Sequence, residues 1–309
     1  MGEGLAGRPA TAAAEKSDIE LDQDLFFPAA TQLGHENETV RNLLIDAEHK
    51  IGELELIKNS LVALADEMAL TIYRTARSFV VKEALDFSTA LFMADGQLIA
   101  QGTCLPFHLG AMPFAVKAVT RAYEHRILPG DLYITNDPYD GSTHLPDIVL
   151  VKPIFHEQQL IGFSAALAHM TDIGGRIPGG NASDSTEIYQ EGLRIPPSRL
   201  WREGEPDETM FRLIERNVRV PDMVLGDIRS LVAACIVGER ELIKLNERYG
   251  RIQFEQYCRD LLDYTERFTR AEIAKLRTDE HFAAQDGKLQ EIMDGERVDV
   301  RVSVLPIVD

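Results

Sequence analysis

The sequence has few basic residues, few cysteines and no long apolar run. Its 309 residues include 32 Lys and Arg against 50 Asp and Glu, which gives a formal net charge of −18. A surface of this sign does not attract nucleic-acid phosphates or anionic lipid headgroups, so we expect neither partner. No stretch approaches about 18 uninterrupted apolar residues, so we expect no membrane-spanning helix.

Signals for secretion and disulfide formation are also absent. The N-terminus lacks a basic segment followed by an apolar core and does not resemble a signal peptide. The three cysteines, Cys104, Cys235 and Cys258, form no CxxC pair and cannot all be bridged. These features favour reduced thiols in a cytoplasmic protein.

Nucleotide-binding motifs are missing as well. No GxxxxGK[ST] loop occurs, and the glycines of GGRIPGGN do not follow the GxGxxG spacing. The chain therefore carries no recognisable nucleotide fingerprint of its own.

The composition that remains is typical of a globular protein, with 45% apolar and 27% charged residues. Residues 1–50 are small, polar and acidic, and we expect them to form a partly disordered arm. A strand-rich core that contains the candidate metal site is predicted over 51–206. Residues 207–309 are predicted to form helices and the start of a further sheet.

The periodicity of the core region predicts its elements. Apolar residues spaced three and four apart indicate a helix over 53–77, with core positions at Leu54, Ile57, Leu61, Leu64 and Met68. Two apolar runs flank Asp95-Gly96, a pair that favours a type I′ hairpin turn. A second helix is predicted at 110–126. Three strands are predicted in DLYITND, DIVLVKPIF and LIGFSAALAH, with HEQQ turning between the last two.

The second half of the sequence changes character. Residues 174–198 are rich in Gly and Pro and are predicted to be mostly loop. Helices are predicted at 207–217, 222–248 and 252–278, and the alternating RVDVRVSVLPIV predicts a strand. The sequence thus predicts an α+β fold, with a mixed, strand-rich core, an N-terminal helix and a C-terminal helical layer.

The densest polar cluster, NDPYDGSTHLPD, lies between two predicted strands. It contains His144 and Asp147, while His169 ends the strand LIGFSAALAH. If these strands pair, two imidazoles and one carboxylate can face each other and hold one Mn, Zn or Fe ion with open positions. Alternatively, each histidine is an ordinary hydrogen-bonded residue. The spacing alone leaves both interpretations open.

Three further residues are candidates for catalytic roles. Asp172 can orient a metal-bound imidazole from the second layer. Glu191 can act as a general base, although a solvated carboxylate fits its surroundings equally well. His108 precedes a predicted helix and either lines a pocket or caps that helix. Three arginines, Arg194, Arg216 and Arg219, can meet a phosphate or form surface ion pairs.

Six motifs occur in an order that resembles the hydantoinase B/oxoprolinase family, which includes alpha-type subunits of acetone and acetophenone carboxylases. The resemblance covers about residues 54–250 and rests on KEALDFSTALFMADGQLIAQ, PFHLGAMP, NDPYDGSTHLPDIVLVKPIF, AHMTDIGGRIPGG, TEIYQEGLRIPP and NVRVPDMVLGDIRSLVAA. Carboxylase relatives hold a metal with His-x-x-Asp and a later His. Carried onto this sequence, these are His144, Asp147 and His169, the same residues that the spacing indicates.

The resemblance implies a subunit of an ATP-dependent enzyme. A hydantoinase A-like partner would bind ATP and phosphorylate the carbonyl oxygen of the substrate, and this chain would act on the activated species. Family members continue with a glycine-rich second half, so either the subunit is naturally split and a further chain supplies that half, or this is a shortened form. The motif THLPD favours hydrolysis of a hydantoin, 5-oxoproline or another lactam. Carboxylation of a ketone and a non-catalytic assembly role are the alternatives.

Overall fold

The structure, a computed structural model, describes the backbone of residues 38–105, 108, 110–180, 182–274, 285–293 and 296–304. These residues fall into two compact units. Residues 52–262 make up one unit, which contains the sheet and the candidate site. The other unit includes the first turns of helix α2, the last turns of helix α7 and the hairpin β8–β9. Most of the arm predicted over 1–50 lies outside the described residues.

Helices and strands follow the predicted sequence of elements. The α-helices are α2 (Glu38–Thr75), α3 (Phe79–Lys82), α4 (Met112–Ala122), α5 (Glu208–Asn217), α6 (Pro221–Tyr249) and α7 (Arg251–Ala274). The strands are β1 (Phe87–Met93), β2 (Leu98–Gln101), β3 (Leu132–Thr135), β4 (Asp147–His156), β5 (Gln159–His169), β6 (Ser198–Arg202), β7 (Glu205–Pro206), β8 (Gln285–Met293) and β9 (Glu296–Val304). Two 3-10 turns, η2 (Pro138–Asp140) and η3 (Ile188–Gln190), lie in the loops.

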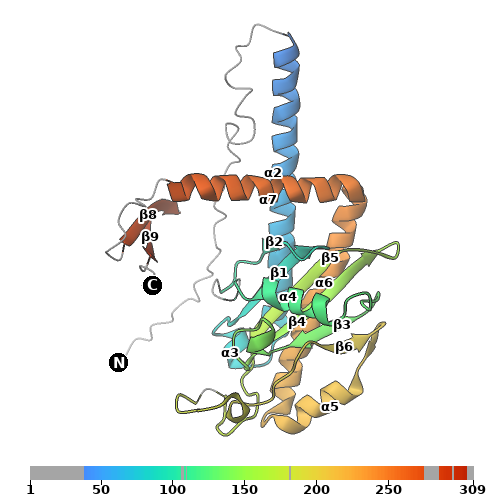
Figure 1. The fold of residues 1–309 in the computed structure, drawn as a ribbon, viewed down its shortest axis with the longest axis vertical. Coiled ribbons are helices and arrows are strands. Elements are labelled where there is room, and N and C mark those ends of the chain that lie inside the picture. The colour runs from blue at the N-terminus through green and yellow to red at the C-terminus, as the bar shows by residue number, and fades with distance from the viewer. Residues whose placement is uncertain are drawn as a thin grey trace, which may run out of the picture. The chain divides into compact units, whose positions relative to one another are not determined.

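Seven of these strands form one sheet with the order β2-β1-β5-β4-β3-β6-β7 (Figure 1). Every neighbouring pair in it is antiparallel. The longest pair, β4 and β5, is central and is joined by a two-residue turn. The predicted α+β fold is confirmed.

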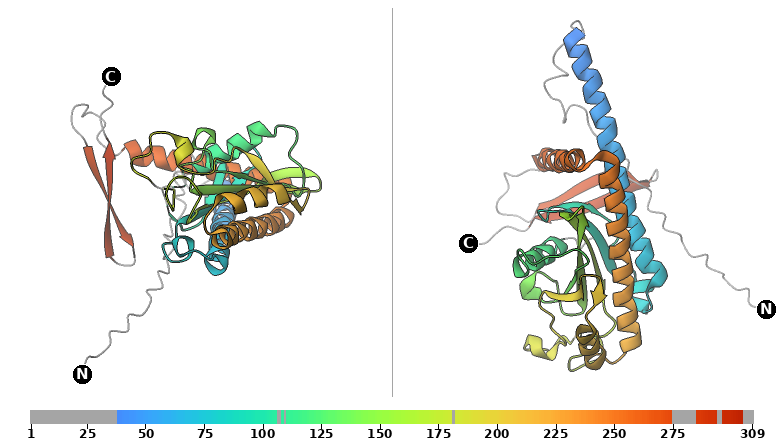
Figure 2. Two further views of the ribbon diagram at one scale, coloured as in Figure 1. Left: turned by 90° about the horizontal axis from the view of Figure 1, so that it is seen from below. Right: turned by 90° about the vertical axis from the view of Figure 1, so that its right-hand side faces the viewer.

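Helices cover both faces of the sheet. Figure 2 shows α4 on one face and α6 beside α2 on the other. The side chains alternate accordingly: Phe163 and Leu167 of β5 pack with Val116 of α4 in one buried cluster. Ser164, which points to the opposite face, donates a hydrogen bond to the carbonyl of Cys235 in α6 at 2.9 Å. Both faces of β5 are therefore buried, which explains its nearly uninterrupted apolar sequence.

Close packing fixes α6 against α2 and the sheet. A Cβ atom added at Gly238 would lie 2.7 Å from both Met68 Sδ and Ser164 Cβ, so only glycine fits between these neighbours. The next residue of α6, Glu239, places its carboxylate oxygen Oε1 3.3 Å from Nζ of the buried Lys152 of β4. The apolar stripe of α2 is buried as predicted, including Leu61 and Leu64.

Two local predictions need correction. The helix predicted to start at residue 53 starts at Glu38, because the single Gly52 weakens a helix without ending it. The turn at Asp95-Gly96 is not type I′, since only Gly96 has a positive φ and the bonds around it close a type I turn with a bulge. The positive φ pair of a type I′ turn occurs instead at Glu157 and Gln158, between β4 and β5.

Among the described residues, no helix is long and apolar enough to cross a bilayer.

Candidate functional site

The predicted metal ligands lie at one end of the sheet, where the neighbouring strands β1, β5 and β4 begin or end side by side. Asp147 begins β4, His169 ends β5, and the two are direct partners in the β4–β5 register. The backbone N–H of His169 donates to the carbonyl of Asp86, just before β1, at 3.0 Å. His144 lies in the loop before β4, where its carbonyl accepts from the backbone N–H of Asp147 at 3.0 Å.

The three predicted ligands form a small triangle of polar atoms. His144 Nε2 lies 2.9 Å from Asp147 Oδ1, and His169 Nδ1 lies 3.0 Å from the same oxygen. The two imidazole nitrogens are 3.1 Å apart. If both donated to the carboxylate, their N–H groups would face each other. A shared cation instead accepts a lone pair from each of the three atoms.

The size of the triangle matches metal coordination. Ligand atoms about 2.1 Å from an ion, at right angles to one another, are separated by roughly 3.0 Å. Two imidazole nitrogens and one carboxylate oxygen suit Zn, Mn or Fe, and three ligands on one face leave positions for water or substrate. The residues present thus fit a divalent ion.

Electrostatics also favour the charged carboxylate of Asp147. Burial opposes ionisation, but hydrogen bonds from His144, His169 and the Thr143 hydroxyl outweigh it and hold the pKa of Asp147 well below its ordinary range. The hydrogen bond to Asp147 raises the pKa of His144 against the effect of burial. An ionised Asp147 is the form that binds a cation.

His108 lies behind the triangle and is fully buried. Its Nε2 is 3.8 Å from Asp147 Oδ2 and 3.4 Å from Asp86 Oδ1, while its Nδ1 is 3.0 Å from the Ser88 hydroxyl. Burial lowers the pKa of His108 against the attraction of both carboxylates. The structure therefore brings His108 to the predicted ligands, at a distance that suits positioning of Asp147.

Glu191 and Asp172 belong to the glycine-rich loop beside the triangle. The negative charge of Glu191 acts on His144 and favours its protonated form. The carboxylate of Asp172 is engaged by the backbone N–H groups of Gly174, Gly179 and Arg219, and by the Arg219 guanidinium at 2.8 Å. Asp172 thus holds this loop in place and is not among the three ligand atoms of the triangle.

Sequence reasoning missed two residues of this region, Asp86 and Ser88. Both precede or begin β1, and only the β1–β5 pairing brings them to His108. The Oδ1 atom of Asp86 is buried and has no hydrogen-bond partner within the described part of the chain. The motif spacing gave no signal for either residue, because they lie about 50 residues before the polar loop.

The cysteines offer no competing nucleophile. All three are free. Burial raises the pKa of Cys104 to about 11 and the pKa values of Cys235 and Cys258 to about 12. Such thiols stay protonated near neutral pH, which agrees with a packing role.

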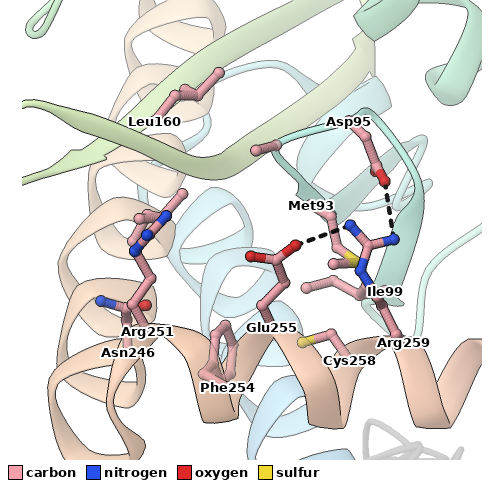
Figure 3. A pocket seen from close by; sticks show the side chains of 12 residues that line it. Met93, Asp95, Ile99, Leu160, Asn246, Arg251, Phe254, Glu255, Cys258 and Arg259 are labelled. Atoms are coloured by element: carbon pink, nitrogen blue, oxygen red, sulfur yellow. Dashed lines mark hydrogen bonds and ion pairs between the residues drawn. The ribbon is translucent and has the colours of Figure 1, made fainter.

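A second polar hollow lies at the other end of the sheet, under the start of α7 (Figure 3). Its cavity volume is about 50 Å³, and it contains none of the predicted site residues. Three of its charged residues pair with one another, since Arg259 bridges Glu255 at 2.8 Å and Asp95 at 3.6 Å. We therefore place the candidate functional site at the triangle.

Comparison with known proteins gives matches over the same region. Caprolactamase subunit beta from Pseudomonas jessenii is 38% identical over 218 residues, which cover 71% of this chain and 38% of that protein. The crystal structure of ATP-dependent caprolactamase from the same organism superimposes with a TM-score of 0.69 at 36% identity, covering 77% of this chain and 40% of that chain. The chain thus spans about two-fifths of the length of these relatives.

The fold recurs in a more distant enzyme. The nucleotide-free structure of acetone carboxylase matches with a TM-score of 0.67 at 20% identity, over 76% of this chain and 31% of that chain. The family model for hydantoinase B/oxoprolinase matches residues 52–308, which include every residue of the triangle. The chain belongs to the hydantoinase B/oxoprolinase family.

Proposed function

We propose that this chain is the metal-binding part of an ATP-dependent hydrolase that opens a cyclic amide. The observation that carries the proposal is the triangle of His144, Asp147 and His169, found in a chain that resembles a caprolactamase subunit. The relative's designation as a beta subunit supports the expectation of a partner. That partner would be a hydantoinase A-like chain that binds ATP.

Each residue of the site has a proposed task. His144, Asp147 and His169 would hold one divalent ion, which would act as a Lewis acid and lower the pKa of water. Thr143 and His108 would orient Asp147 from its second oxygen. Glu191, beside His144, would take a proton from the attacking water. Asp172 would hold the loop that carries Glu191 through its bonds to the glycine amides.

The need for ATP follows from amide chemistry. A ring amide is stabilised by resonance, and its nitrogen is a poor leaving group. Phosphorylation of the carbonyl oxygen by the partner would convert the amide into an imidate-like species. Water would add to its carbon and expulsion of the ring nitrogen would open the ring to an acyl phosphate. A second water would then release inorganic phosphate and leave the carboxylate. The part of this chain would be to hold the activated carbon beside the nucleophile and to remove its proton.

Carboxylation is the second candidate function. The fold is shared with acetone carboxylase, and the same three ligands would position an enolate and an electrophile derived from bicarbonate. A non-catalytic assembly role is the third. The three candidates differ in their requirement for bicarbonate and metal.

The test is reconstitution with the ATP-binding partner and any chain that co-purifies. Caprolactam, hydantoin, 5-oxoproline, acetone and acetophenone are supplied in turn, with and without bicarbonate, and ADP and product are measured. We expect turnover that depends on a cyclic amide and needs no bicarbonate, and that is abolished by His144→Ala with His169→Ala. Bicarbonate-dependent consumption of a ketone would instead establish the carboxylase. Metal-free wild-type protein with undiminished activity would overturn the role of the triangle.

A further inference from the structure

An arginine beside the triangle keeps its terminal nitrogens available. The Nε of Arg194 donates to Asp137 Oδ2 at 2.6 Å, and its guanidinium lies 5.1 Å from the centre of the Tyr139 ring. Asp137 is buried and also accepts the backbone N–H of Tyr139 at 3.0 Å. This clamp fixes the plane of the guanidinium through one nitrogen. Neither Nη1 nor Nη2 contacts an acceptor among the described residues.

Two other arginines in this region, Arg219 and Arg176, donate hydrogen bonds from their terminal nitrogens to acceptors of the protein. Arg219 directs Nη1 to Asp172 and to the Gly174 carbonyl, and its Nη2 donates to the carbonyl of Gly175 at 2.6 Å. Arg176 uses Nε and Nη2 for Ser185 and Asp184. Arg194 thus differs from both neighbours in presenting two adjacent donors that the fold does not need.

Arg194 lies close to the predicted metal ligands. One amide group, Nδ2 of Asn136, donates to the carbonyl of Leu145 at 2.6 Å and to that of Leu193 at 2.9 Å. His144 and Arg194 directly adjoin these two leucines in the sequence, so a single side chain ties their backbones together.

A second link joins the ends of the same loop. Ser142 donates its N–H to the Asp137 carbonyl and its hydroxyl to the Asp147 carbonyl, both at 3.1 Å. The carboxylate that orients Arg194 and the carboxylate of the triangle therefore belong to one braced loop.

Tyr139, whose ring Arg194 contacts, and Tyr189, five residues before Arg194 in the sequence, are both exposed. The exposed fractions of Tyr139 and Tyr189 are 77% and 78%. The hydrogen bond that Arg194 donates to Asp137 raises the pKa of Arg194, and the phenols of Tyr189 and Tyr139 act in the same direction. Large exposed aromatic faces next to a donor fork are suited to a ligand that joins an anion to a flat ring.

We propose that Arg194, with Tyr139 and Tyr189, forms the subsite that receives the phosphate of the ATP-activated substrate. The inference rests on the proposed function and adds a ligand class to it, a phosphate ester of a planar cyclic amide. The two Nη groups of Arg194 grip two phosphate oxygens, and the tyrosine rings cover the flat ring of the ligand. In a chain of net charge −18, this local cation offsets the repulsion that a phosphate otherwise meets.

The first experiment measures binding without turnover. Phenyl phosphate, which joins a phosphate to a flat ring, is titrated calorimetrically into the full chain carrying His144→Ala and His169→Ala, so that no ion at the triangle contributes. We expect Arg194→Gln to weaken binding at least about tenfold, because it removes a charge-assisted pair of hydrogen bonds. Arg259→Gln, at the far end of the sheet, is the matched control and leaves the affinity unchanged. Equal affinities of the Arg194 and Arg259 variants would overturn the subsite.

The second experiment measures coupling in the reconstituted enzyme. With Arg194→Gln, the partner still consumes ATP but the activated substrate is poorly retained, so more ADP forms per opened ring and KM rises. Unchanged coupling and KM in that variant would contradict the inference even if the wild type opens lactams. Wild-type enzyme that opens no lactam would contradict the proposed function, while the phenyl phosphate titration still decides the subsite. Thermal melting of both arginine variants confirms that each is folded.

Discussion

The two ends of the β4–β5 hairpin carry polar clusters of opposite character. At the open end, His144 and His169 converge on Asp147, and three lone-pair atoms lie within about 3 Å of one another. At the turn end, His156 is matched by Glu247 at 3.3 Å and by the amide of Asn246 at 3.1 Å. The same pair of strands thus presents one cluster whose three lone-pair atoms suit a cation and another whose histidine is paired with groups of the protein.

The difference teaches how to rank polar clusters by their internal balance. Around His156, donors face acceptors, and nearby Arg259 is matched by two carboxylates. Around Asp147, two imidazole nitrogens converge on one carboxylate oxygen and lie only 3.1 Å from each other. A cation bound between the three atoms would accept a lone pair from each of them. Arg194 instead has donors to spare, which is why we assign it an anion.

The largest expected effect is a loss of bound metal when histidines at the open end of the hairpin are replaced, but not when the histidine at the turn end is. His144→Ala with His169→Ala removes two of three ligands, and we expect the purified protein to lose essentially all of its bound divalent ion. Plasma emission spectrometry measures the ion per chain. His156→Ala is the matched control from the same hairpin and keeps wild-type metal content. Full occupancy in the double variant, or equal loss in the control, would remove the distinction between the two ends.

The second-largest expected effect is a loss of stability when the buried face of α2, which belongs to the unit that carries both ends of the hairpin, is truncated. Leu61 of α2 is buried in the core, so Leu61→Ala leaves a cavity and lowers the free energy of unfolding by roughly 2–5 kcal/mol. Leu56, on the exposed side of the same helix, is the control, and Leu56→Ala changes stability by about 0.5 kcal/mol or less. Urea denaturation gives both values. Equal midpoints for the two variants would mean that the buried face of α2 is misassigned.

The third effect sharpens the metal proposal through a residue that is not a ligand. The Thr143 hydroxyl donates to Asp147 Oδ2 and leaves Oδ1 directed at the two imidazoles. Thr143→Val keeps the shape but removes the donor, so we expect metal affinity to fall by about 10- to 100-fold. Thr143→Ser retains the hydroxyl and restores most of the affinity. Competition with a chelator of known affinity measures the change, and wild-type affinity in the valine variant would show that Thr143 does not orient the ligand.

The sequence predicted most of the fold because its signals were local. The spacing from Leu54 to Met68 and the apolar runs of β4 and β5 each specify an element without reference to the rest of the chain. The turns were less predictable. Asp95-Gly96 has the composition of a type I′ turn, but that conformation occurs at Glu157 and Gln158, where the twist of two long paired strands imposes positive φ on non-glycine residues.

The sequence could predict only those site residues that are close to one another in sequence or are brought together by one hairpin. His144 and Asp147 are three residues apart, and His169 needs only the β4–β5 pairing to join them. Asp86 reaches His108 through β1, a strand whose place beside β5 no motif reveals. The contrast between Arg194 and Arg219 was also hidden, because it depends on the acceptors that the folded loops supply to each side chain.

The smallest expected effect belongs to the turn end of the hairpin. Arg259→Gln breaks the exposed ion pairs with Glu255 of α7 and with Asp95 of the β1–β2 turn. Exposed ion pairs gain little because water and salt screen them and because ordering two long side chains costs entropy. We therefore expect no resolvable shift in the urea midpoint and unchanged metal content, with any residual difference disappearing as sodium chloride is raised. A large, salt-insensitive loss of stability would show that the turn end depends on its charges as strongly as the open end, and the contrast between a self-paired cluster and one that suits a cation would fail.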